Sequence, residues 1–386
     1  MSKLILHIAE ASGGVERYLV TLLTKLKQYP DYEHVLVCST TYDTNKFDNL
    51  VSKTIIINDL HNAISPLSDF KSILRVRKAI LKTKPNIIYC HSSKAGAIGR
   101  IANIGIHNSL IYNPHGWAFN MKNTSRVKLK LYETVEKLLA PMSDRIVCIS
   151  EYEREAALAH KICKANKLIT INNGIDFDEF RNLQQKTRSS LGIPDDAYVV
   201  GTIGRLATQK APDTFIKMAI EVKKHISKSF FLMVGDDIGD GHCRREIEKQ
   251  INDAGLTSSV KITGWVDNPL AYLNIFDVAT LFSRWEGFGL VLPEYMYMGK
   301  PIVATKADAI PNILGDAGLM IDIDDYTQAA KSVILLYENG GIRNKIVEAA
   351  KKRSGLFDAQ RTADEHIRVF TQLCEQQHSA RVKSGH

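Results

Sequence analysis

Two glutamates, Glu286 and Glu294, flank the segment EGFGLVLPE with seven residues between them. The segment follows a short apolar run and precedes a helical pattern, so Gly287 and Gly289 predict a bare loop that opens a helix. Main-chain N–H groups in such a loop can hold phosphate oxygens, and carboxylates accept hydrogen bonds from vicinal sugar hydroxyls. Because Glu286 precedes the helix and Glu294 lies about one turn inside it, we expect both carboxylates to face one pocket.

A pair of cations stands in a second predicted strand-to-helix loop, GRLATQK, where Arg205 and Lys210 are five positions apart. Arginine binds oxyanions through its planar fork and lysine acts as a compact point charge. The two side chains can therefore close on a diphosphate. The structural alternative is a solvated basic loop.

Gly13 and Gly14 lie in the segment ASGGVER, between the first predicted strand and a helix that starts near Val15. Glycines let a backbone approach a ligand closely, and a helix N-terminus offers N–H groups to an anion. A tight turn without a ligand is the alternative. The dinucleotide fingerprint GxGxxG is absent, which disfavours a nicotinamide enzyme.

His115 stands between a proline and a glycine in NPHGW, directly after another apolar run. At a strand end such a histidine faces a ligand cleft more often than the core, although a lone histidine is usually structural. Spacing alone leaves both interpretations open.

These loops need strands to position them, and the chain provides short apolar runs that alternate with helical patterns of 12–18 residues. Such alternation is typical of parallel βαβ units. The predicted strands are 4–8, 35–39, 87–90, 110–113 and 145–149 in the first half, and 199–203, 230–234, 260–262, 278–282 and 302–304 in the second. Helices are expected over 214–226 and 244–254. The fold class is therefore α/β, with two doubly wound Rossmann-like domains.

The domain boundary is predicted after the run 168–171, where a turn-rich, acidic stretch begins. We expect an N-terminal Rossmann-like domain (1–173), a linker (174–192), a C-terminal Rossmann-like domain (193–355), a C-terminal helix that returns to the N-terminal domain (356–378) and a disordered tail (379–386). In open parallel sheets ligands bind at the carboxyl ends of strands, so the predicted site is a cleft where the two sheets face each other.

The charge is uneven along the 386 residues. Residues 1–175 carry 24 Lys and Arg against 14 Asp and Glu, whereas residues 176–386 carry 26 against 28. A basic half suggests an anionic partner: a phosphate-bearing ligand, an acidic membrane surface or a nucleic acid.

Composition and spacing exclude several classes of protein. Hydrophobic residues make up 45% of the chain, and no apolar stretch approaches the ~18–20 residues of a membrane-spanning helix. The N-terminus turns polar and glycine-rich after about six apolar residues, which indicates a first strand and not a signal peptide. The six cysteines lack any metal-binding spacing and indicate free thiols in a reducing cytoplasm.

Together, GGVERYL, GRLATQK and EGFGLVLPE resemble the family 4 glycosyltransferases, with matching organisation over essentially the whole chain. The segment between the two glutamates is the most specific of the three motifs. The resemblance implies the GT-B fold and a retaining, metal-independent transfer of a sugar from a nucleotide-diphosphate sugar.

The resemblance also implies roles for residues. Glu294 would bind the ribose hydroxyls, and Glu286 would hold the transferred sugar. The catalytic residues would be His115, Arg205, Lys210 and Glu286, and the donor-binding residues Gly13, Gly14, Arg205, Lys210, Glu286, Gly287, Phe288, Gly289, Leu290 and Glu294. No metal ligand and no cofactor are expected, since fixed cations and N–H dipoles can neutralise the leaving diphosphate.

Two departures from the family pattern bear on the donor. Ala211 stands where the family usually has glycine after the lysine, and the loop 305–312 lacks the usual glycine pair and the glutamate after proline. Donor identity is therefore open: a UDP-sugar is favoured, with GDP- or dTDP-sugars as alternatives.

Two basic stretches, 71–84 and 126–139, have the pattern of amphipathic helices and could lie on an anionic membrane surface. Sheet-packing helices with solvated faces are the alternative. In the family the N-terminal domain receives the acceptor, often a lipid-linked sugar. We therefore expect an enzyme of the cytoplasm, peripheral on the inner face of the cell membrane, with a polyprenyl-diphosphate-linked glycan acceptor in capsule, exopolysaccharide or O-antigen assembly.

Two rival functions remain at this stage. A hydrolysing sugar-nucleotide epimerase shares the GT-B fold, but the EGFG segment argues against it. A nucleic-acid-binding protein is suggested only by the isoelectric point of about 9.0. No recognition motif for nucleic acid is present, so this partner is not expected.

Overall fold

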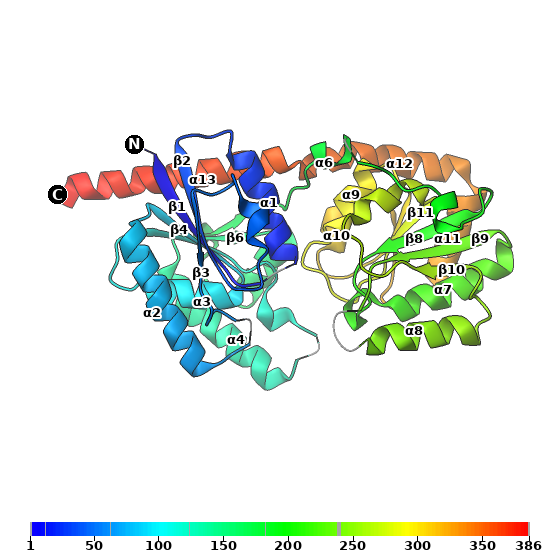
Figure 1. Ribbon diagram of the computed structural model, residues 1–386, viewed down its shortest axis with the longest axis horizontal. Coiled ribbons are helices and arrows are strands. Elements are labelled where there is room, and N and C mark those ends of the chain that lie inside the picture. The colour runs from blue at the N-terminus through cyan, green and yellow to red at the C-terminus, as the bar shows by residue number, and fades with distance from the viewer. Residues whose placement is uncertain are drawn as a thin grey trace. The chain divides into compact units, whose positions relative to one another are not determined.

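The computed structural model describes residues 2–11, 13–61, 63–122, 124–181, 183–237 and 241–384, with side chains up to residue 379. The chain forms two compact units: Met1–Gly174 together with Ala359–His386, and Ile175–Asp358 (Figure 1). Each unit is a parallel sheet between helices, which is the two-domain α/β architecture that the sequence predicted.

The first unit is built on a seven-stranded parallel sheet of order β3-β2-β1-β4-β5-β6-β7. Its strands are β1 Lys3–Ala9, β2 Tyr32–Cys38, β3 Lys53–Ile56, β4 Ile87–His91, β5 Ser109–Asn113, β6 Arg145–Cys148 and β7 Leu168–Thr170. The helices are α1 Gly14–Leu26, α2 Pro66–Thr83, α3 Ser93–Ala102, α4 Arg126–Leu139, α5 Glu151–Ala159 and α13 Ala359–Ser384. The sequence pattern missed β3, a short edge strand that is only partly buried.

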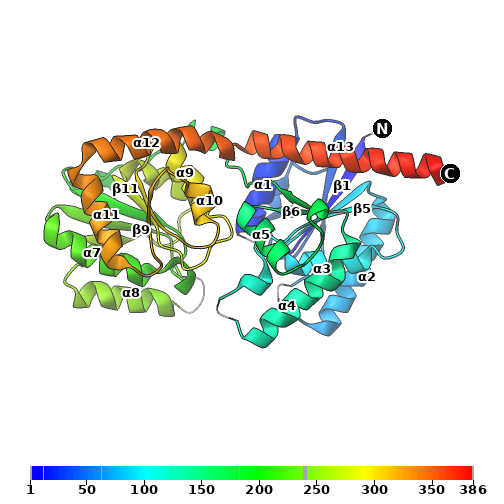
Figure 2. The same ribbon diagram turned by 180° about the vertical axis from the view of Figure 1, so that it is seen from behind.

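The two faces of this sheet have separate cores. Helices α2, α3, α4 and α5 cover one face, where apolar side chains such as Val76 and Ile98 are buried. Helices α1 and α13 cover the other face, where Leu22 and Phe370 pack against the strands (Figure 2). A parallel sheet needs helices on both sides because both faces of its strands are apolar.

The second unit has a six-stranded parallel sheet of order β10-β9-β8-β11-β12-β13. Its strands are β8 Tyr198–Ile203, β9 Ser229–Val234, β10 Val260–Ile262, β11 Val278–Leu281, β12 Ile302–Thr305 and β13 Leu319–Ile321. Its helices are α6 Asp178–Arg181, α7 Pro212–His225, α8 His242–Asp253, α9 Val291–Tyr297, α10 Ile310–Leu314, α11 Tyr326–Glu338 and α12 Gly340–Ser354. Three-residue β13 was not predicted because it is too short to show a period.

Three boundaries differ from those expected. Of the predicted linker 174–192, all residues from Ile175 onward belong to the second unit, and they include α6. The last helix, α13, starts at Ala359 and packs within the first unit. The tail expected to be disordered from residue 379 is helical to Ser384, since no helix-terminating glycine or proline occurs before Gly385. Gly385 and His386 lie outside the described residues.

Within the described ranges, the structure contains no helix of the length and hydropathy that a bilayer crossing requires.

Candidate active site

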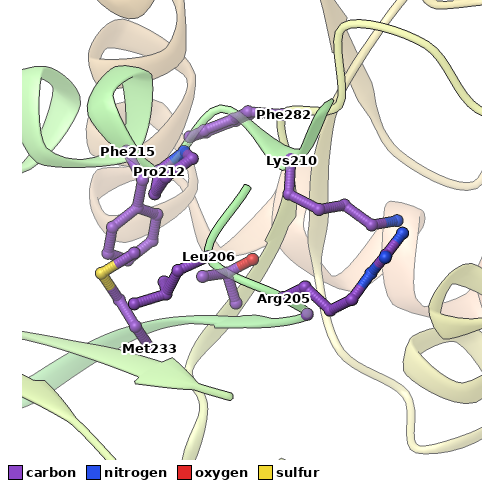
Figure 3. A pocket seen from close by; sticks show the side chains of 9 residues that line it. Arg205, Leu206, Lys210, Pro212, Phe215, Met233 and Phe282 are labelled. Atoms are coloured by element: carbon purple, nitrogen blue, oxygen red, sulfur yellow. The ribbon is translucent and has the colours of Figure 1, made fainter. Parts of the chain in front are cut away.

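The cation loop of the second unit follows β8. Arg205 is exposed, and Lys210 ends the short 3-10 helix Thr208–Lys210. Both line a pocket whose other end is apolar, with Leu206, Phe215 and Met233. In Figure 3 the charged ends of Arg205 and Lys210 point toward one another, away from that apolar end. The structure thus brings together the two cations that the sequence paired.

Lys210 forms an ion pair with Glu286, which follows β11. The side chains of both residues are mostly buried, 19% and 12% exposed, and Ser283 Oγ donates a further hydrogen bond of 3.1 Å to Glu286 Oε2. A charge-assisted hydrogen bond in such surroundings is stronger than one at the surface. Two predicted site residues 76 positions apart in sequence therefore meet at adjacent strand ends.

The backbone of Glu286 is held by the loop after β12. Asp308 Oδ2 accepts a 3.0 Å hydrogen bond from the Glu286 N–H, and the Glu286 carbonyl accepts one of 3.2 Å from Ala309 N–H. Asp308 has φ 44°, a left-handed conformation that aspartate adopts more readily than most residues. In the loop where the family's glycine pair is missing, an aspartate thus takes the left-handed position and orients Glu286.

The glycine loop between the two glutamates is tightly packed. Gly289 has φ 80°, and a Cβ there would lie 3.2 Å from Glu286 Cγ and from Leu281 Cδ2. Phe288 is buried against Phe357, and Leu290 is the residue before α9. Glycine at position 289 is therefore required both by the backbone conformation and by the space beside Glu286.

Glu294 is fully buried within α9, between buried Leu292 and Met296. Burial raises the pKa of its neighbour Tyr295 above the ordinary value, and the charge of Glu294 adds to this effect. The two glutamates thus have different settings: Glu286 is partly open and paired with a cation, whereas Glu294 is enclosed. The sequence predicted that both would face one pocket and did not reveal this difference.

Ala211 explains the first departure from the family pattern. Its backbone has φ 49° and ψ 54°, the left-handed region that favours glycine, and it is fully buried before α7. Its conformation places Lys210 at the end of one turn and Pro212 at the start of the next helix. The turn is therefore formed despite the alanine, at a cost in backbone strain.

The remaining predicted site residues lie in the first unit. Gly13 has φ 80° and precedes α1, and Gly14 is its first residue; a Cβ at either position would meet no atom within 4 Å. Ser12, which precedes them, lies outside the described residues. His115 follows β5 with φ 50°, and its N–H donates 3.0 Å to Asn113 Oδ1. Burial lowers the pKa of His115 to about 3, so its ring is neutral at physiological pH.

Several residues that support the site were missed by sequence reasoning. Arg284 Nη2 binds Asp213 Oδ2 at 2.8 Å and its Nε binds Asp324 at 2.8 Å, which ties the glutamate loop to α7. Gln209 Nε2 donates 3.0 Å to the Trp285 carbonyl and its Oε1 accepts 3.2 Å from Arg205. No residue-type signal marks these partners, because they meet only through the parallel strand order.

Two acidic stretches of the second unit, 236–237 and 322–325, are held by partners within the fold. Asp236 pairs with Arg244 at 2.7 Å, and Asp237 caps α8 by accepting from Cys243 N–H at 2.9 Å. Asp324 pairs with Arg284 and accepts a 3.0 Å hydrogen bond from Thr214 Oγ1. Within the described ranges, no three His, Cys, Asp or Glu side chains come together as a metal site would require.

Comparison with known proteins agrees with this fold. The family "Glycosyltransferase Family 4" matches residues 12–179, and "Glycosyl transferases group 1" matches residues 184–353. Among solved structures, Anabaena Alr3699/HepE in complex with UDP and glucose aligns with a TM-score of 0.80 at 20% identity, over 95% of this chain and 99% of that one. Sucrose-phosphate synthase from Thermosynechococcus elongatus aligns with a TM-score of 0.81 at 20% identity, over 96% and 99%.

Two of the sequence relatives come from bacteria. A Klebsiella pneumoniae protein, described as an uncharacterized 41.2 kDa protein in the cps region, is 30% identical over 95% of this chain and 99% of its own length. An Escherichia coli UDP-Gal:alpha-D-GlcNAc-diphosphoundecaprenol alpha-1,3-galactosyltransferase is 27% identical over 81% of this chain and 84% of its own.

The two parallel-sheet units and their strand-end loops define a glycosyltransferase of the GT-B fold. The chain belongs to the family 4 glycosyltransferases.

Proposed function

We propose that this glycosyltransferase moves a sugar from a UDP-sugar to a polyprenyl-diphosphate-linked glycan in the assembly of a capsule, exopolysaccharide or O-antigen. GDP- and dTDP-sugars are the alternative donors. The observation that carries the proposal is the meeting of Arg205, Lys210 and Glu286 at the ends of neighbouring strands β8 and β11. The E. coli relative, named for a UDP-sugar and a diphosphoundecaprenol acceptor, supports these choices.

The ion pair between Lys210 and Glu286 holds the site ready for a donor. We propose that the donor diphosphate binds Lys210 and Arg205, while Glu286 accepts hydrogen bonds from the sugar hydroxyls. Glu286 keeps its position during this exchange because Ser283 and Asp308 hold its carboxylate and its N–H. Glu294 would accept hydrogen bonds from the ribose hydroxyls. Since Glu294 is buried, the groups that cover it on α9 would move aside when the nucleotide binds. His115, Gly13 and Gly14 would contact the sugar and phosphates.

Transfer is proposed to proceed with retention and without metal. The bond between the anomeric carbon and the phosphate oxygen breaks, and the acceptor hydroxyl oxygen bonds to that carbon on the same face. Its proton passes to the departing phosphate oxygen. Fixed cations beside the phosphate stabilise the charge that develops there, which is the largest catalytic contribution expected in such a site.

A membrane surface is the proposed location of the acceptor. Four apolar residues on α2 are more than half exposed and lie on one face at helical spacings: Leu67, Phe70, Leu74 and Leu81. Helix α4 exposes Val127, Leu131 and Leu138 in the same way. Lys71, Lys78 and Lys82 stand among the apolar residues of α2 and are exposed. An apolar stripe flanked by cations suits an anionic leaflet, where each cation contributes about 1 kcal/mol.

The donor is tested by a thermal-shift panel of UDP, GDP, dTDP and their sugars, with and without a chelator. A ligand that binds only the folded state raises the melting temperature. We expect a shift with UDP-sugars that the chelator leaves unchanged. No shift with any nucleotide would contradict the proposed donor site.

The reaction is tested with the donor that binds and a synthetic polyprenyl-diphosphate-linked acceptor. NMR of the product should show that the anomeric configuration of the donor is kept. An inverted product would overturn the retaining mechanism, and release of a free sugar from the donor regardless of acceptor would overturn transfer.

Membrane binding is tested by co-flotation with phosphatidylglycerol or phosphatidylcholine vesicles. We expect flotation with the anionic vesicles, and its loss in the double variant Leu67→Ser, Phe70→Ser. Lys249→Gln on α8, an exposed lysine of the second unit, is the matched control. Equal flotation of the double variant and the control with anionic vesicles would exclude α2 as the membrane contact.

A further inference from the structure

Four histidine rings in the first unit are joined end to end. His34 Nδ1 lies 3.0 Å from His7 Nε2, His7 Nδ1 lies 3.1 Å from His91 Nε2, and His91 Nδ1 lies 3.2 Å from His115 Nε2. Each contact joins the Nδ1 of one ring to the Nε2 of the next. The four side chains therefore form one continuous hydrogen-bonded chain that ends at a predicted site residue.

The histidine chain crosses the sheet diagonally. His34, His7 and His91 belong to the neighbouring strands β2, β1 and β4, and His115 follows β5. His34 pairs in register with Ile5 and His91 with Ala9, so the histidine chain advances toward the carboxyl ends of the strands. His7 and His91 are fully buried and His34 is 5% exposed, whereas His115 is partly exposed.

All four rings are neutral at physiological pH. Burial lowers the pKa of His34 to about 4 and that of His115 to about 3, and it lowers the pKa of His7 and His91 well below 6.5. The groups that face them from other elements are aromatic or neutral. They are Tyr18 of α1, Tyr89 of β4 and His366 of α13.

A neutral imidazole has one N–H donor and one acceptor nitrogen. A ring in the middle of the histidine chain must therefore accept from one neighbour and donate to the other, so all three hydrogen bonds point the same way. The direction of these hydrogen bonds is set by His34, at the end of the chain far from His115. His34 Nε2 is buried and has no hydrogen-bond partner in the described part of the protein. A buried N–H without a partner is the rarer defect, so this nitrogen carries the lone pair and His34 Nδ1 donates.

With that polarity every ring is protonated on Nδ1, including His115. We propose that His34, His7 and His91 are positioning residues that fix His115 as a neutral Nδ1–H donor, which recognises an oxygen lone pair of the transferred sugar. The ligand in this inference rests on the proposed function. The tautomer of His115 does not, because the rings upstream of it set the proton position in the ligand-free protein.

The tautomer is tested by NMR of ligand-free protein labelled with ¹⁵N-histidine, with the His115 signals assigned by loss in His115→Gln. We expect Nδ1–H shifts for His115 in the parent protein. His34→Asn can still donate an amide N–H from the place of Nδ1 and should keep them. His34→Asp offers only an acceptor when ionised, so at pH 8 it should reverse the chain and move the His115 proton to Nε2.

Nε2–H shifts for His115 in the parent protein would overturn the proposal. So would His115 signals in folded His34→Asp that match those of His34→Asn. Melting curves confirm that each variant is folded, and His225→Gln on the exposed face of α7 controls for labelling and assignment.

A kinetic arm tests the ligand. In His34→Asp, Nδ1 of His115 becomes a hydrogen-bond acceptor, and KM for the nucleotide sugar should rise about tenfold. In His34→Asn, most of this rise in KM should be absent. A reversed tautomer with an unchanged KM would refute sugar recognition by His115 while the polarity stands. No turnover in the parent protein with any nucleotide sugar would refute the proposed function and leave the NMR result intact.

Discussion

The two units share a parallel-sheet plan, but the residues at their strand ends are chemically different. In the second unit Lys210 and Glu286 form an ion pair beside Arg205, and both partners remain partly exposed. In the first unit His115 is the end of a neutral, mostly buried histidine chain. The lysine of an ion pair can exchange its carboxylate partner for a phosphate. A neutral histidine chain instead offers one N–H donor at a fixed position, which suits an uncharged hydroxyl.

The net charge of each unit also does not predict where cations gather at the strand ends. The first unit carries most of the excess of basic residues, yet Lys71, Lys78 and Lys82 lie on the exposed face of α2. The second unit has a slight acidic excess and nevertheless gathers two cations at one pocket. The strand order decides which cations come together at a strand end.

The largest effect is expected for the charged site. Lys210→Ala should lower kcat by about 10²- to 10³-fold, because a fixed positive charge beside the leaving phosphate is lost. The measurement is the initial rate at saturating donor. Lys217→Ala, which removes an exposed lysine of α7 that pairs only loosely with Asp213, is the control. Equal kcat values for the two variants would remove Lys210 from the catalytic site.

A smaller loss is expected at the enclosed glutamate. Glu294→Gln keeps the shape of the side chain but loses its charge, and should weaken binding of the nucleoside diphosphate by about 10- to 100-fold. Isothermal titration calorimetry measures this affinity, with exposed Glu348→Gln on α12 as the control. Unchanged affinity in Glu294→Gln would mean that the nucleotide does not reach α9.

Acid should destabilise the first unit more than the second. The pKa values of His34 and His366 are lowered to about 4 and that of His115 to about 3, so the folded state binds fewer protons than the unfolded state below pH 6.5. The contribution of these neutral histidines to the free energy of unfolding is complete above pH 6.5. It is lost as the pH falls toward 4, by about 1.4 kcal/mol per pH unit for each such histidine. Glu153, whose pKa burial raises to about 8, acts in the opposite direction but is outnumbered.

The described histidines of the second unit, His225 and His242, are exposed, and neither lies in a buried histidine chain. Hydrogen-exchange mass spectrometry between pH 7 and pH 4.5 should therefore show the first unit losing protection before the second. Simultaneous loss in both units would contradict the contrast between a neutral chain and a charged pair.

The smallest effect concerns the strained turn beside Lys210. Ala211→Gly should stabilise the second unit by about 1 kcal/mol, because glycine adopts φ 49° without the clash of a Cβ. Scanning calorimetry should show a higher melting temperature for the second unit alone. Ala219→Gly inside α7 is the control and should lower it. A lower melting temperature in Ala211→Gly would mean that the buried methyl group contributes more than the strain costs.

The sequence by itself determined the two α/β units, most of their strands and the glutamate segment with its cation loop. These features are local: apolar period, glycine position and residue type are read within a dozen residues. It did not determine the short strands β3 and β13, whose pairing depends on neighbours already in the sheet.

The tertiary structure alone decided which distant side chains meet. Lys210 pairs with Glu286 because β8 and β11 are adjacent. Three histidines in β2, β1 and β4 join His115, which follows β5, because the order β2-β1-β4-β5 places them side by side. The tertiary structure also enclosed Glu294. Strand order is a property of the whole sheet, set by the packing of both faces, and no short stretch of sequence encodes it.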